Sequence, residues 1–432
     1  METRTLSKIE DLLVKALRAA ARNEVVECDT FRELSPVEWQ MFYALAAGHK
    51  LLPMIYEATY AYLADRAKET EDPESEYSLM LKMHSRRAVM AVLVQTAKSA
   101  AFLDLYRYME EKGLHPVVVK GIVLRAIYPD GDHRPSADED IVIPKEEWDR
   151  AVQALREYGM EPIEEVTDNA FEIGWRKKSL YVELHRDLFE PDTEFGRQMV
   201  ELFDGALLRT GEAKVTAEKG KEPVAVRTFS ETDHLLYLIA HAYKHFVHSG
   251  FGLRQILDIA LFAEVYGDKV DFRMLREKCR KVHAEKFAAA CFMVSETYLG
   301  VPVKALSDGA DTFADLRAID PAPLLADLTS AGLYGTSSLS RAHSATVTKN
   351  AVEAHRENRK SSVWKSAFPG RAKLVGAYPE LKKYPILLPF VWVKRLFRYG
   401  METKTERNSE LSETLRIAKE RTELLKYYDI LG

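Results

Sequence analysis

Short runs of β-branched and aromatic residues in the middle of the chain constrain its fold most. Residues 117–119 are three consecutive valines, which is typical of a strand buried on both faces. Further strands are expected at about 138–143, 171–175 and 180–185, and the last two are joined by a polar link that predicts a hairpin. These runs predict one small mixed β-sheet.

Helical periodicity dominates on both sides of this sheet. Ser35 followed by Pro36 predicts a capped helix start, and further helices are expected over 52–68 and 76–112. The predicted fold class is therefore α+β, with a small sheet embedded in a mainly α-helical protein. We expect four regions: an N-terminal helical region (1–112), the sheet core (113–229), a helical domain (230–310), and a basic and aromatic C-terminal region with a terminal helix (311–432).

Composition indicates an ordinary globular protein. The 432 residues are 47% hydrophobic, with a net charge of −5, which predicts no strong overall attraction to nucleic acid or anionic membranes. Three scattered cysteines are typical of a reducing compartment. The charged N-terminal segment does not resemble a signal peptide, and apolar runs such as 287–294 and 386–393 are too short to span a bilayer. We therefore expect a cytoplasmic protein without a transmembrane segment.

One segment departs from this acidic balance. Residues 341–400 hold 13 Lys and Arg but 3 Asp and Glu, a local net charge of +10, with interleaved aromatic residues. Three interpretations stay open: a solvated face around an aromatic core, an acceptor-binding surface, or a membrane-surface contact. Nucleic acid is an open but not favoured partner.

Acidic residues on the predicted strands indicate a metal site. Asp138 and Asp140 are two residues apart, so a strand would project both side chains to one face. Glu183, on another strand, is a third carboxylate of the right type. Because hard divalent cations prefer carboxylate and phosphate oxygens, these three residues predict a site for Mg²⁺, or Mn²⁺, that handles a nucleoside triphosphate.

Basic residues near these acids predict phosphate binding. Lys120 and Gly121 follow the valine strand and precede a helix, where free backbone N–H groups and the absence of a Cβ favour an anion. Arg134 precedes the two aspartates, and Lys120 and Arg134 can each place a positive charge on a triphosphate. Lys244, in a later helix, is a further candidate for phosphate contact.

Histidines suggest additional roles. His185 projects to the same side as Glu183, where it can shuttle a proton or orient that carboxylate. His241 and His245 have a spacing compatible with zinc, but we favour a core or substrate-facing role for them. Arg254 and Asp258 have the i, i+4 spacing of a pair on one helix.

The ordered set of motifs resembles the nucleotidyltransferases of the DNA-polymerase-beta superfamily, in particular a bacterial branch of uncharacterised nucleotidyltransferases. The specific motifs lie between residues 116 and 188: Lys120-Gly121, Tyr128-Pro129, Arg134-Pro135, Asp138-Glu139-Asp140-Ile141 and Glu183-Leu184-His185. A looser likeness covers residues 30–400, including His241, His245 and Asp258.

This resemblance implies an enzyme that transfers a nucleoside monophosphate from a nucleoside triphosphate, with ATP preferred, to an unidentified acceptor, with release of pyrophosphate. In that reading Asp138, Asp140 and Glu183 bind metal and catalyse, whereas Lys120, Gly121, Arg134, His185 and Lys244 bind the nucleotide. The alternative is a silent nucleotide-sensing or partner-binding module.

Two residues depart from the family pattern. Ile122 stands where a second small residue is usual, and Glu139 stands where an apolar residue is usual. Burying an acid at Glu139 would be costly, so we expect either that the strand begins at Asp140 or that Glu139 lies at an exposed sheet edge.

Overall fold

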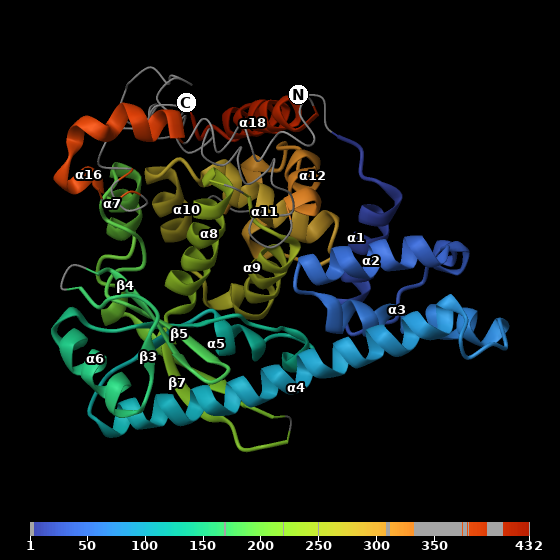
Figure 1. The fold of residues 1–432 in the computed structure, drawn as a ribbon, viewed down its shortest axis with the longest axis horizontal. Helices are drawn as coiled ribbons and strands as arrows, with labels where there is room; N and C mark the ends of the chain where they lie inside the picture. Colours follow the sequence, from blue (N-terminus) through green and yellow to red (C-terminus); the bar gives the residue numbers. More distant parts are fainter. Residues whose placement is uncertain are drawn as a thin grey trace.

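A five-stranded mixed sheet lies against one side of a larger helical body in the computed structural model (Figure 1). The structure describes residues 4–167, 170–218, 220–248, 250–307, 312–331, 380–394 and 409–431, together with Leu374 and Tyr378. Most of the basic 341–400 segment therefore lies outside the described residues, and its three interpretations stay predictions.

The N-terminal helices form where the sequence predicts them. They are α1 (Lys8–Ala20), α2 (Pro36–Gly48), α3 (Leu52–Glu69) and α4 (Glu76–Glu111). Ser35 accepts a hydrogen bond from the backbone N–H of Glu38, whose side chain caps Ser35 in return, so a full capping box starts α2. Figure 1 shows α4 running from these helices to the sheet.

Strand order places two of the acidic strands side by side. The sheet runs β1 (Val117–Val119), β2 (Glu139–Val142), β5 (Leu180–His185), β4 (Glu172–Lys177) and β3 (Glu161–Pro162). Strands β2 and β5 are parallel, whereas the β1–β2, β4–β5 and β3–β4 pairs are antiparallel. The predicted hairpin is thus β4–β5. A second sheet, β6 (Thr210–Val215) with β7 (Val224–Phe229), was not expected from the sequence.

Short helices connect the strands. After β1 comes α5 (Gly121–Arg125), and α6 (Trp148–Glu157) and α7 (Glu194–Glu201) follow β2 and β5. The trailing helices are α8 (Glu231–His248), α9 (Leu253–Tyr266), α10 (Phe272–Lys281), α11 (Glu285–Thr297) and α12 (Ala322–Ala331), and α16 (Glu380–Lys383) and α18 (Ser409–Tyr427) lie near the C-terminus. The α+β fold class is confirmed.

Two apolar cores hold these elements together. One unites side chains from the N-terminal helices, from α8 to α12 and from α18, with Trp39, Tyr43 and Phe287 among its fully buried members. The other packs α4 and α6 against the sheet through residues such as Phe102 and Trp175. Segments far apart in the sequence therefore share one core, and the four-region division stays a prediction.

Helix α4 has an unusual apolar surface. By length and composition it is long and apolar enough to cross a membrane, and 33% of its most apolar 18-residue stretch is buried. Leu79, Met90 and Leu93 are about half exposed on its outer face. The core helix of a soluble protein can be equally long and apolar. The cytoplasmic location and the lack of a transmembrane segment therefore stay predictions.

Candidate active site

Strand pairing brings the predicted acids together. In the parallel β2–β5 pair, Asp140 lies directly opposite Glu183. His185 follows two residues later on β5, and its Nε2 lies 3.2 Å from Asp140 Oδ1 and 3.7 Å from Glu183 Oε2. One ligand atom from each of Asp140, Glu183 and His185 falls within 4.8 Å of the other two, so these residues could hold a metal ion.

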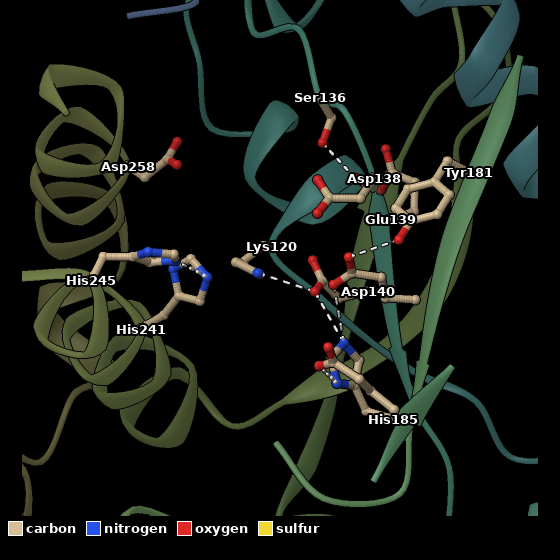
Figure 2. Close-up of polar contacts among 12 residues, drawn as sticks. Lys120, Ser136, Asp138, Glu139, Asp140, Tyr181, His185, His241, His245 and Asp258 are labelled. Atoms are coloured by element: carbon tan, nitrogen blue, oxygen red, sulfur yellow. Dashed lines mark hydrogen bonds and ion pairs between the residues drawn. The ribbon is translucent and has the colours of Figure 1, made fainter. Parts of the chain in front are cut away.

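Asp138 lies just before β2 and outside this three-residue cluster. It lines the same pocket as Asp140, however, and Figure 2 shows both carboxylates on the side that faces Lys120. The hydroxyl of Ser136 donates to the backbone carbonyl of Asp138 at 2.6 Å, which fixes the turn into β2. Two strand-borne carboxylates with a third beside them suit a hard divalent cation, and the donor set therefore fits Mg²⁺ or Mn²⁺.

Lys120 is held in an unusual backbone conformation beside these acids. Its φ of 54° is rare for a residue with a side chain, and such strain persists where surrounding contacts enforce it. Here the Lys120 N–H donates to His234 Nε2 at 3.2 Å, and Thr228 Oγ1 lies 3.1 Å from His234 Nδ1. The Lys120 ammonium thereby reaches Asp140 Oδ1 at 3.0 Å (Figure 2).

The two paired acids of this site titrate in opposite directions. Burial would raise the pKa of Asp140, but the adjacent Lys120 and His185 outweigh it and hold that pKa at about 2. Burial, together with the charges of Asp140 and Asp138, raises the pKa of Glu183 to about 7. Tyr181 donates to Glu183 Oε1 at 3.1 Å. The Asp140 carboxylate thus stays ionised at neutral pH, whereas the Glu183 carboxyl can gain or lose a proton there.

Both expectations for Glu139 were wrong. Strand β2 begins at Glu139 rather than at Asp140, and Glu139 is 3% exposed rather than at an open edge. Its carboxylate accepts a hydrogen bond from the backbone N–H of Ile122 at 2.7 Å, on the opposite side of β2 from the metal-type ligands. Burial raises its pKa to about 7. Glu139 therefore links β2 to the start of α5.

This link determines what Gly121 does. Its φ is +38°, and a Cβ at this position would lie 1.9 Å from Glu139 Oε2. The glycine is therefore required by the close approach of Glu139, which uses the Ile122 N–H that the sequence suggested for phosphate. Gly121 still lines the pocket, and phosphate contact by its backbone stays a prediction.

Arg134 is committed to a buried ion pair. Its Nε and Nη2 donate to the two carboxylate oxygens of Asp258 at 2.7 and 2.8 Å, and Tyr128 donates to the same carboxylate at 2.7 Å. Arg134 Nη1 also donates to the Gly121 carbonyl at 3.2 Å. Asp258 therefore pairs with Arg134, whereas Arg254 donates to the Pro135 carbonyl at 2.6 Å. A triphosphate contact by Arg134 stays a prediction.

The central pocket, which lies between the sheet and helices α8 and α9, has a volume of about 420 Å³, open space at its mouth included. Lys120, Asp138 and Asp140 line one side, and His241, Arg254 and Gln255 line the other. Lys244 does not line it, and its ammonium lies 5.9 Å from the centre of the Phe189 ring.

Sequence reasoning missed His234, Tyr181, Arg254 and Gln255 as parts of this site. The α8 and α9 residues belong to apolar helical patterns that indicate core packing, and nothing local to them signals a pocket. Tyr181 carried a signal that could have been used, because it lies two residues before Glu183 and so projects to the same face.

One protein family matches the part of the chain that forms this pocket. The model of the family described as uncharacterised nucleotidyltransferase matches residues 35–300, which include the whole sheet and helices α8 and α9. No curated protein matches the chain. No solved structure matches it. The match covers more than half of the chain and contains every residue of the central pocket, and the chain therefore belongs to the uncharacterised nucleotidyltransferase family.

Proposed function

We propose that the chain transfers a nucleoside monophosphate from a nucleoside triphosphate, ATP in the first instance, to a hydroxyl group of an acceptor. The observation that carries this proposal is the pairing of Asp140 with Glu183 across parallel strands, with Asp138 lining the same pocket. In the reaction, the acceptor oxygen forms a bond to the α-phosphorus, the bond from that phosphorus to the bridging oxygen breaks, and pyrophosphate leaves.

Asp138, Asp140 and Glu183 would hold Mg²⁺ or Mn²⁺, which supplies positive charge to the phosphates when bound. Glu183 would complete the metal site and so help to activate the acceptor hydroxyl, whose proton is released to solvent. Without nucleotide, the Lys120 ammonium pairs with Asp140. When nucleotide binds, it donates to phosphate oxygens instead. His185 keeps Asp140 in position through its Nε2 contact.

The test uses purified protein with each α-labelled nucleoside triphosphate, Mg²⁺ or Mn²⁺, and a lysate as the source of acceptors. We expect pyrophosphate release and a labelled acceptor, both lost in Asp138→Asn and Asp140→Asn. Asp104→Asn, on the exposed face of α4, is the matched control and keeps full activity. Full activity in both pocket variants would refute the assignment. Nucleotide binding without turnover on any acceptor would favour the sensing module.

A further inference from the structure

Two buried nitrogen donors in the central pocket have no acceptor. Arg254 and Gln255, on α9, are 6% and 7% exposed and both line the pocket. Arg254 Nε and Gln255 Nε2 make no hydrogen bond to any described residue. Because buried N–H groups are nearly always paired in native proteins, two orphaned donors in one pocket indicate a missing ligand that accepts hydrogen bonds.

Other contacts hold both side chains in place. Arg254 Nη1 donates to the Pro135 carbonyl at 2.6 Å, which ties α9 to the loop before β2. Gln255 Oε1 accepts from the Gly252 N–H at 2.7 Å, so its amide NH₂ is left as the available end. The orphaned donors are therefore parts of fixed side chains, which is the arrangement that a binding site requires.

Two histidines extend this wall along α8. His241 lines the pocket, and its Nε2 lies 3.3 Å from His245 Nε2. Figure 2 shows both imidazoles across the pocket from Asp138 and Asp140, with Lys120 between the two sides. The Tyr237 ring lies 6.0 Å from that of His241. We call His241, His245, Arg254 and Gln255 the α8–α9 wall.

The charges around this wall favour an anion over a metal cation. Burial lowers the pKa of both histidines, and the nearby charges of Lys120 and Lys244 lower both further, as Arg254 does for His241. The acid of α9 in the pocket, Asp258, already accepts hydrogen bonds from Tyr128 and Arg134. A ligand with several anionic oxygens satisfies the donors and relieves the repulsion among these cations.

We propose that the α8–α9 wall binds the pyrophosphate portion of the nucleotide, opposite the acids that face the metal. This inference rests on the proposed function, and it assigns the phosphate contacts to residues other than Arg134. The orphaned donors support it, because Arg254 and Gln255 line the same pocket as Asp138 and Asp140.

The test measures binding of inorganic pyrophosphate without divalent metal, by calorimetry at pH 6.5. We expect His241→Gln and Arg254→Gln to weaken binding at least tenfold, whereas Arg107→Gln on the exposed face of α4 leaves it unchanged. Asp138→Asn keeps or strengthens binding because it removes a negative charge. Thermal unfolding by circular dichroism identifies variants that fail to fold, and pyrophosphate affinity equal to that of the native protein in folded wall variants would overturn the inference.

Pyrophosphate binding at the wall without nucleotidyl transfer would refute the proposed function alone, and transfer with an unchanged KM in wall variants would refute the wall alone.

Discussion

The buried ion pair between Arg134 and Asp258 should tolerate the loss of both charges better than the loss of one. The two side chains are 2% and 6% exposed, and three hydrogen bonds of 2.7 to 2.8 Å converge on the Asp258 carboxylate. In Asp258→Asn, one oxygen still accepts from Tyr128, but the Arg134 guanidinium is left buried without a counter-charge. Such an uncompensated charge costs about 3–5 kcal/mol.

The double variant Arg134→Met/Asp258→Asn removes this penalty. Methionine fills much of the arginine volume without charge, and the introduced amide oxygen can still accept from Tyr128, so we expect a loss of about 1–2 kcal/mol. The coupling energy between the two sites should therefore be about 2 kcal/mol or more.

Urea denaturation at pH 7, followed by tryptophan fluorescence, measures these free energies of unfolding. Arg107→Ala is the control, because its ion pair with Asp104 is exposed and should contribute less than about 0.5 kcal/mol. A loss below about 1 kcal/mol in Asp258→Asn would refute the reasoning. So would a double variant whose loss equals the sum of the single losses, because the two charges would then be independent.

Three further predictions concern the residues around β2. Glu139→Gln keeps an acceptor for the Ile122 N–H but removes a carboxyl whose pKa rises from 4.5 to about 7 on folding. The stability that this carboxyl contributes is present below pH 4.5 and is lost, by about 3 kcal/mol, as the pH rises through 7. The variant should therefore gain stability relative to the native protein over this range in urea titrations, and a pH-independent difference would contradict this. Gly121→Ala places a Cβ 1.9 Å from Glu139 Oε2 at a φ of +38° and should lower the free energy of unfolding by about 1–3 kcal/mol. The control Gly48→Ala, where a Cβ has nothing within 4 Å, should not lower it. Equal melting temperatures for the two variants would count against the close approach. The Mg²⁺ affinity measured by calorimetry should rise about tenfold from pH 6 to pH 8, because the Glu183 carboxyl, with a pKa of about 7, must lose its proton before it binds the ion. Glu183→Gln should bind Mg²⁺ weakly and without this rise. An equally steep rise in the variant would exclude Glu183 as its source.

Local patterns in the sequence predicted the elements that local physics determines. The capping box at Ser35 starts α2 because its partner, Glu38, is three residues away. The valines of β1 and the i, i+2 spacing of Glu183 and His185 likewise predicted a strand and a shared face. The acids of the site were therefore predictable as a set, since each one lies on or beside a strand with a readable pattern.

Packing between distant segments decided which polar groups meet. Arg134 and Asp258 are 124 residues apart, and Lys120 and His234 are 114 residues apart, so no periodicity in the sequence could pair them. The same holds for Glu139, whose burial becomes acceptable because α5 presents the Ile122 N–H to it. Residue types and their spacing were thus enough to predict which acidic side chains lie near one another. Folding alone settled which of them are committed to structural pairs and which face the pocket, because a polar group is satisfied by whatever the fold places beside it.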